Sequence, residues 1–243
     1  MRVGVYVDGY NLYYGGRGLC GRRTPGWRWL DVRAMVAAVL RGRHDWPGAR
    51  LERVVYCTAR VDGRTNPEAH REQDVYLKAL VAHGAVDHIE YGAFVARART
   101  APLATIDEKG RPVVTTSRWP IMVKDADGAD VPNAVFVAQV LNVEEKGSDV
   151  NVATRLLLDV LRGDVDAAIV VSNDSDLRLP VHEARQLVPV GVVNPGARPL
   201  AGALRGTRSE GAGRHWWTTL TTHDFMAHQL PAVVGTSTRP AAW

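Results

Sequence analysis

The sequence predicts an α/β fold whose mostly parallel central sheet is flanked by helices on both faces. Short apolar runs rich in valine alternate along the chain with segments whose apolar residues recur at helical spacing. Alternation of this kind is typical of parallel strands joined by helical crossovers. The length of 243 residues suits one large domain, or a compact domain with an insertion.

Five runs are predicted as strands, because each is short, apolar and bounded by polar or turn-forming residues. They are residues 2–7, 53–58, 86–94, 167–171 and 188–193. The run at 167–171 is wholly apolar, as expected of a central parallel strand that is buried on both faces. The run at 188–193 is predicted to be the last strand of the chain.

Helices are predicted from apolar spacing and from signals at their ends. They cover residues 30–41, 66–84, 148–162, 180–187 and, in the tail, 224–229. Ser148 is predicted to cap its helix, and Pro180 suits the first turn of the next one. The glycines at positions 15, 16, 18 and 21 instead predict a flexible stretch after the first strand.

The segment 96–142 departs from the alternation of strands and helices. Turn signals at 108–112 and 126–130 separate strand-like pieces at 113–116, 119–123 and 135–143. We predict a β-hairpin elaboration on an edge of the sheet. The rest is then one domain over residues 1–195, with residues 196–243 as a C-terminal extension that packs on the same domain.

The composition favours a protein of the cytoplasm. No apolar run approaches the ~18 residues of a membrane span, and the N-terminus lacks the apolar segment of a secretory signal. The two cysteines, Cys20 and Cys57, are too few for a disulfide framework. A net charge of +4 and a pI of 9.3 are compatible with a polyanionic partner.

Four aspartates occur where predicted strands meet loops or helix starts. Asp8 ends the first strand, Asp149 opens a helix, and Asp174 and Asp176 follow another strand. Because functional groups gather at the carboxyl ends of parallel strands, we expect these carboxylates to converge, with Asn11 as a neutral companion. Their repulsion would be relieved by Mg²⁺ or Mn²⁺. Taken singly, each aspartate also suits a turn or a helix cap.

Three segments carry a resemblance: Val-Asp-Gly-Tyr-Asn at 7–11, Lys-Gly-Ser-Asp-Val at 146–150 and Val-Ser-Asn-Asp-Ser-Asp-Leu at 171–177. Together they resemble the signature blocks of the NYN-domain family of PIN-like nucleases. The resemblance covers roughly residues 2–195, interrupted near 96–142, and implies a PIN-like fold. The third block departs from the family in carrying Ser-Asn-Asp where Ser-Gly-Asp is frequent.

The resemblance implies a metal-dependent phosphodiesterase that hydrolyses single-stranded RNA, with endonucleolytic cleavage preferred on resemblance alone. The predicted catalytic residues are Asp8, Asn11, Asp149, Asp174 and Asp176, and the four aspartates are the predicted ligands of Mg²⁺ or Mn²⁺. Two alternatives stay open. One is a catalytically inactive RNA-binding or regulatory module, and the other is a phosphomonoesterase. The aspartyl-phosphate type commonly has Asp-x-Asp after its first strand, which this chain lacks.

Basic residues near these blocks are predicted to hold the RNA backbone. They are Arg17, Arg22, Arg23 and Lys146, with Ser172 positioning water or phosphate. Trp27 and Trp29 either stack on bases or anchor their loop to the core, and the second reading is favoured. A second basic and aromatic stretch, at 205–217, either lengthens the RNA groove or mediates self-association, which leaves a homodimer open.

Overall fold

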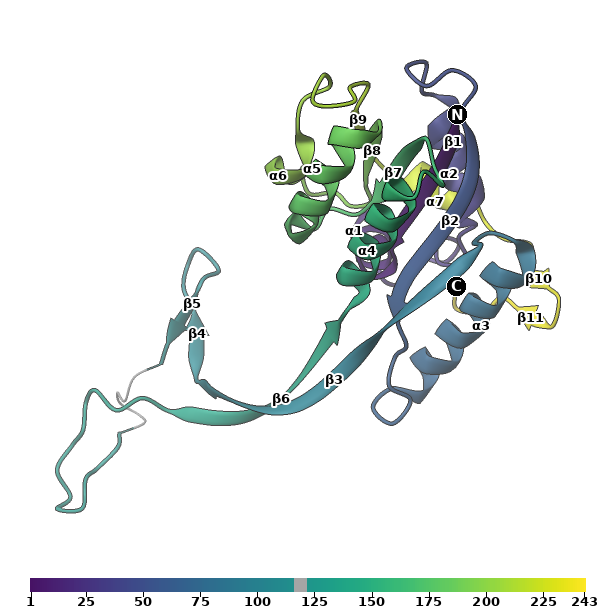
Figure 1. The fold of residues 1–243 in the computed structure, drawn as a ribbon. Coiled ribbons are helices and arrows are strands. Elements are labelled where there is room, and N and C mark those ends of the chain that lie inside the picture. Colours follow the sequence, from purple (N-terminus) through teal and green to yellow (C-terminus); the bar gives the residue numbers. More distant parts are fainter. Residues whose placement is uncertain (116–121) are drawn as a thin grey trace. The chain divides into compact units, whose positions relative to one another are not determined.

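A computed structural model of the chain describes residues 1–115 and 122–243 (Figure 1). Its main strands are β1 (Arg2–Asp8), β2 (Arg50–Ala59), β3 (His88–Pro102), β6 (Val137–Lys146), β7 (Ala167–Val171), β8 (Val190–Asn194) and β9 (Trp216–Thr219). They form a seven-stranded sheet in the order β6-β3-β2-β1-β7-β8-β9, and the ladders from β3 through to β9 are parallel. The prediction of a mixed α/β fold with a large, mostly parallel central sheet is confirmed.

Helices connect and cover the strands of this sheet. They are α1 (Gly9–Cys20), α2 (Val32–Arg41), α3 (Pro67–His83), α4 (Ser148–Leu161), α5 (Arg178–Leu187), α6 (Gly202–Arg205) and α7 (Thr222–Ala227). The side chains of Asp8, Asp31 and Asn66 accept hydrogen bonds from the first turns of α1, α2 and α3. Each such cap satisfies a helical N–H group that has no partner within the helix.

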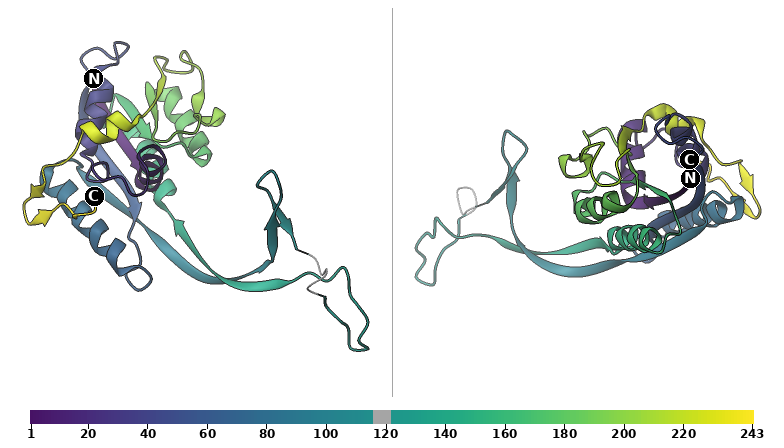
Figure 2. Two further views of the ribbon diagram at one scale, coloured as in Figure 1. Left: turned by 180° about the vertical axis from the view of Figure 1, so that it is seen from behind. Right: turned by 45° about the horizontal axis from the view of Figure 1, so that its top comes forward.

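Each face of the sheet carries its own hydrophobic core, and helices lie on both faces (Figure 2). Val5 and Val7 of β1 belong to the core cluster that contains Met35 of α2 and Leu80 of α3. Tyr6, between them in sequence, belongs to the second cluster, which α4 and α5 cover. This division follows from the alternation of side chains along a strand.

The first helix corrects one prediction. Gly15, Gly16 and Gly18, predicted as a flexible stretch, lie inside α1. A Cβ at Gly16 would stand 2.6 Å from the ring of Phe225 and 2.9 Å from that of Trp27. The glycine therefore allows close packing of α1 against these rings, and this need explains it better than chain flexibility does.

The tail corrects the prediction that residues 188–193 form the last strand of the chain. Strand β9 comes later in the chain and pairs with β8, and a small antiparallel pair, β10 (Val233–Val234) with β11 (Ser237–Thr238), follows it.

The predicted N-terminal cap of α4 is wrong. Ser148 is the first helical residue, preceded by Gly147 at φ 94°, a backbone angle that glycine adopts readily.

Residues 95–144 form a compact unit of their own, separate from the unit of residues 1–94 and 145–243. The smaller unit contains the antiparallel pair β4 (Ala104–Ile106) and β5 (Pro112–Val114). The predicted strand at 119–123 lies mostly outside the described residues. Within the described parts of the whole chain, no helix is both long and apolar enough to cross a membrane.

Gly191 of β8 pairs with Trp216 of β9, and a Cβ at this glycine would overlap the indole ring. The ring is buried and in edge contact with Trp46, at 5.2 Å between centroids. Because the ring is confined, we expect Gly191→Ala to lower the free energy of unfolding by about 1–3 kcal/mol in urea titrations. Gly202→Ala, with no atom within 4 Å of its Cβ, is the control. Equal losses in both variants would contradict the confinement.

Candidate functional site

The candidate site begins at Asp8, the last residue of β1 and the N-cap of α1. Its side chain is 5% exposed. One carboxylate oxygen accepts a hydrogen bond from the backbone N–H of Asn11 at 2.9 Å. Because β1 passes directly into α1 without a connecting loop, the carboxylate is fixed at the carboxyl edge of the sheet.

The loop after β7 completes the site, because β7 is the parallel neighbour of β1 and Val171 pairs with Val7. The hydroxyl of Ser172 donates to the second carboxylate oxygen of Asp8 at 3.0 Å, and accepts from the N–H of Asp174 at 3.1 Å. The side-chain oxygen of Asn11 accepts from the N–H of Asn173 at 3.2 Å. The structure therefore brings Asp8, Asn11, Ser172 and Asp174 together.

Burial raises the pKa of Asp8 from 3.8 to about 6. The hydrogen bonds from Asn11 and Ser172 oppose this by stabilising the charged form, while the nearby carboxylates of Asp174 and Glu145 raise the pKa further. Asp8 is thus a carboxylate that exchanges a proton close to neutral pH. A group of this kind can accept a proton from a bound molecule.

Glu145 of β6 was missed by the sequence reading. It accepts hydrogen bonds from the backbone N–H and the hydroxyl of Ser148, at 3.2 and 2.6 Å. It also raises the pKa of both Asp8 and Tyr10. The sequence signal that could have found it is its position three residues before Ser148, where its side chain can reach the first turn of α4.

The remaining predicted acidic residues have other surroundings. Asp176 lies in a short 3-10 turn, Ser175–Leu177, and its N–H donates to the side chain of Asp174 at 3.0 Å. Asp149 lies in the first turn of α4. Among residues 1–115 and 122–243, no group of three or more His, Cys, Asp or Glu side chains is arranged to hold a metal ion. The predicted convergence of four carboxylates on one cation does not appear among them.

Aromatic side chains of α1 lie beside Asp8. Tyr10, Tyr13 and Tyr14 are 44%, 39% and 46% exposed. The rings of Tyr10 and Tyr14 are 4.5 Å apart, and those of Tyr13 and Tyr14 are 5.3 Å apart in an edge contact. Burial, followed by a hydrogen bond with Tyr14, raises the pKa of Tyr10 to about 12, so its hydroxyl stays neutral. The result is an exposed aromatic surface next to a buried carboxylate.

The predicted RNA-binding residues are spread over this end of the molecule and the loop after α1. The guanidinium of Arg17 lies 5.6 Å from the centre of the Tyr14 ring. Arg22 and Arg23 lie in the exposed loop beyond α1, and Lys146 ends β6. RNA binding and self-association stay predictions.

Trp27 and Trp29 are buried, at 2% and 0% exposed, which confirms that they anchor their loop to the core. The indole N–H of Trp27 donates to the carbonyl of Gly21 at 3.1 Å, and that of Trp29 to the carbonyl of Pro231 at 2.7 Å. These tryptophans are therefore closed to stacking partners.

No protein-family model matches the chain. One curated relative, 6-hydroxy-3-succinoylpyridine 3-monooxygenase HspA of Pseudomonas putida, is 24% identical over 261 aligned positions, which cover 100% of this chain and 75% of the relative. Among solved structures, a protein of unknown function from Vibrio parahaemolyticus is similar with a TM-score of 0.43 and 15% identity, over 94% of this chain and 96% of that one.

The curated relative corrects the predicted function. The relative, whose similarity covers the whole of this chain and 75% of its own length, is a monooxygenase, an oxidoreductase, so the prediction of a metal-dependent ribonuclease, a hydrolase, is wrong. The prediction of Mg²⁺ or Mn²⁺ as the cofactor is wrong for the same reason. The physical reason lies in what the aspartates do here. Asp8 caps α1 and Asp174 caps the 3-10 turn, so each already has a structural role at a strand end.

Proposed function

We propose that this protein is an oxidoreductase of the monooxygenase class, which inserts one oxygen atom into a small, ring-hydroxylated aromatic compound. The observation that carries the proposal is the similarity to a monooxygenase named for a hydroxylated pyridine, because that similarity spans the whole chain. It therefore includes Asp8, the tyrosines of α1 and the loop after β7.

The exposed tyrosines supply the binding surface for the ring. Aromatic side chains attract planar rings through stacking and edge contacts worth about 0.5–1.5 kcal/mol per pair beyond the buried area. Tyr10 and Tyr14 offer such faces, and Tyr10 lies close enough to Asp8 for the carboxylate to raise its pKa. A ring stacked on Tyr10 therefore lies close to the carboxylate of Asp8.

Asp8 is the proton acceptor. Attack by an activated oxygen species is electrophilic, so a ring becomes more reactive when its hydroxyl group loses a proton. With a pKa of about 6, Asp8 is charged at neutral pH yet buried, and it can accept that proton. Ser172 and the N–H of Asn11 hold the carboxylate in place during the transfer.

The overall reaction consumes dioxygen and a two-electron donor, which we assign to the reduced nicotinamide class. A ring C–H bond and the O–O bond break, and a C–OH bond forms. The second oxygen atom leaves as water, with a hydride from the nicotinamide and one proton from solvent. The residues around Asp8 bind the ring and move its hydroxyl proton.

A dinucleotide does not fit at the β1–α1 junction, where open α/β sheets commonly hold one. There the N–H of Asn11 is already occupied by the Asp8 carboxylate, and the helix starts at Gly9 without a glycine-rich loop. A pyrophosphate would face that negative charge. Asp8 therefore serves the aromatic compound rather than a dinucleotide.

We also propose that the core keeps the PIN-like arrangement implied by the NYN-domain resemblance. The support is structural: the first and third resemblance blocks meet at the ends of β1 and β7, through the hydrogen bonds among Asp8, Asn11, Ser172 and Asn173. This part of the proposal concerns the fold alone.

The proposal is tested with purified protein, a reduced nicotinamide and a panel of hydroxypyridines and phenols with carboxylate side chains. We expect nicotinamide oxidation that depends on the aromatic compound, and a product that carries one oxygen atom from isotopically labelled dioxygen, detected by mass spectrometry. Nicotinamide oxidation without label in the product would count against oxygen insertion, and so would incorporation from labelled water.

A further inference from the structure

A cavity lies at the opposite end of the sheet from Asp8. It has a volume of about 670 Å³, within the ordinary range for small-molecule sites. It is bounded by α2, the loop after α2 and the start of β2. Since Arg50 pairs with Arg2, the first residue of β1, this is the amino edge of the parallel strands.

The lining of the cavity is basic. It includes four arginines and one histidine, and no carboxylate. These basic residues are Arg33, Arg41, Arg43, His44 and Arg50. Such an imbalance raises the concentration of anions in a concave site. Arg41 lies in the last turn of α2, where the helix dipole favours a positive charge. The other basic residues lie outside that turn, so the dipole does not explain why they are there.

Several of these cations have hydrogen-bonding groups to spare. Arg33 is already paired with Asp87 and the carbonyl of Gly84. Among the described residues, by contrast, Arg41 and His44 form no side-chain hydrogen bond or ion pair. In the part of the chain that the structure describes, the only carboxylate paired with Arg50 is that of Glu52, at 3.4 Å. The side chain of Arg50 is 71% exposed.

Arg43 gives a second, independent indication. Its guanidinium lies 4.6 Å from the centre of the Trp216 ring, and its Nε atom is buried without a hydrogen-bond partner among the described residues. A buried donor left without a partner costs about 1–3 kcal/mol. Arg43 also lines the cavity, so an anion bound there can lie next to its guanidinium charge.

The floor of the cavity is apolar and fixed. Leu40 and Trp46 are 7% and 2% exposed. The indole N–H of Trp46 donates to the carbonyl of Arg214 at 2.9 Å, and its ring contacts Trp216. A cavity with a rigid apolar floor and cationic walls suits a small molecule that has both a planar apolar part and an anionic part.

We propose that this cavity binds the phosphate groups of a small phosphorylated molecule. The planar fork of an arginine matches a phosphate through paired hydrogen bonds, and several arginines around one cavity suit a pyrophosphate better than a single carboxylate. The site is distinct from Asp8, because the two lie at opposite ends of the parallel strands.

The test is calorimetric titration of the full chain with inorganic pyrophosphate, at fixed ionic strength. We expect saturable binding to the unaltered protein. Arg41→Glu with Arg50→Glu should weaken it at least tenfold, since two attractive charges become repulsive. Both side chains are exposed, so the doubly substituted protein should keep its melting temperature. Arg162→Glu is the matched control, an exposed arginine at the end of α4, and should bind as the unaltered protein does.

Two outcomes would overturn the proposal: no saturable binding of pyrophosphate, or equal weakening in the double variant and the Arg162→Glu control. Titration with succinate addresses the ligand class. Phosphate recognition predicts at least tenfold weaker binding of succinate, and equal affinity for the two anions would contradict it. The measurement needs no turnover, so its outcome is independent of the proposed oxygenase activity.

Discussion

Asp8→Asn is expected to lower the rate of oxygen insertion by about 10²–10⁴-fold, the usual contribution of a proton-transfer group. The amide oxygen can still accept from the N–H of Asn11, so the cap of α1 is kept while the proton acceptor is lost. In the unaltered protein, kcat/KM should fall as the pH drops below about 6, because Asp8 becomes protonated. Steady-state measurements of labelled product against pH check both expectations.

Asp176→Asn is the matched control for this prediction. Asp176 lies in the same group of loops but only its backbone N–H contributes to the hydrogen bonds there. Its activity should stay close to that of the unaltered protein. If Asp8→Asn keeps full activity, or if Asp176→Asn loses as much, Asp8 is not the proton acceptor.

The same Asp8→Asn variant is expected to be more stable than the unaltered protein at neutral pH. The folded-state pKa of Asp8 is about 6, above its ordinary 3.8, so its charged form is disfavoured by folding. At about 1.36 kcal/mol per pKa unit, the charge costs up to roughly 3 kcal/mol above pH ~6 and nothing below pH ~4. Urea titrations should therefore show a gain near neutrality that disappears in acid.

The core of the fold could be predicted because its signals are local. Strand β7 can be recognised from its wholly apolar run. Helix α3 can be recognised from its cap at Asn66 and the glycine that ends it, Gly84. The glycines of α1 misled the prediction, since the close approach of Phe225 to Gly16 joins residues far apart in the chain. β9 was missed for a similar reason: its place depends on pairing with β8.

The candidate site was predicted in part. Asp8, Ser172 and Asp174 follow neighbouring parallel strands, and the ends of such strands lie together whatever the rest of the fold does. Glu145 lies on a long edge strand, where no local pattern indicates which residue reaches the site. The chemistry was mistaken because a carboxylate at a strand end serves equally as a helix cap, a metal ligand or a proton acceptor.

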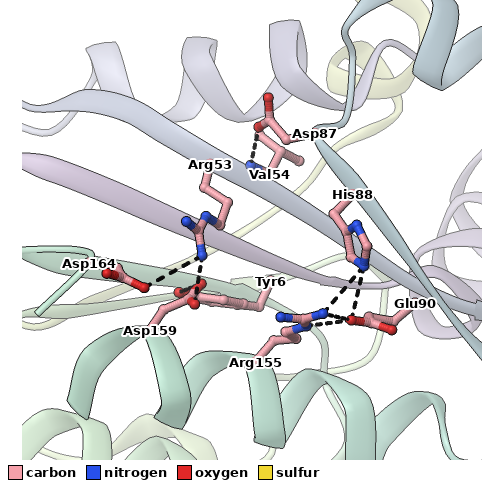
Figure 3. A network of polar contacts seen from close by, with 9 residues as sticks. All are labelled: Tyr6, Arg53, Val54, Asp87, His88, Glu90, Arg155, Asp159 and Asp164. Carbon is pink, nitrogen blue, oxygen red and sulfur yellow. Dashed lines mark hydrogen bonds and ion pairs between the residues drawn. The ribbon is translucent and has the colours of Figure 1, made fainter. Parts of the chain in front are cut away.

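Asp159→Ala is expected to have the largest effect on stability, lowering the free energy of unfolding by about 3 kcal/mol or more. Asp159 of α4 is 1% exposed, and Figure 3 shows it beside Tyr6 and Arg53. It accepts a hydrogen bond from the hydroxyl of Tyr6 at 2.9 Å and forms an ion pair with Arg53 at 2.7 Å. Alanine would leave the buried hydroxyl without its acceptor, and Arg53, whose side chain is 38% exposed, would keep only the longer ion pair with Asp164 at 3.9 Å. Asp45→Ala, which breaks an exposed ion pair with Arg208, should cost under about 1 kcal/mol.

A double-variant cycle separates the loss of this contact from the loss of packing. Burial and Asp159 both raise the pKa of Tyr6, so its hydroxyl remains protonated and needs an acceptor. Tyr6→Phe alone should cost about 1–2 kcal/mol. Because the orphaned hydroxyl is the main penalty of Asp159→Ala, adding Tyr6→Phe should remove part of that penalty, and the combined loss should fall short of the sum by at least about 0.5 kcal/mol. Strict additivity in urea titrations would mean that Asp159 stabilises the fold through Arg53 rather than through Tyr6.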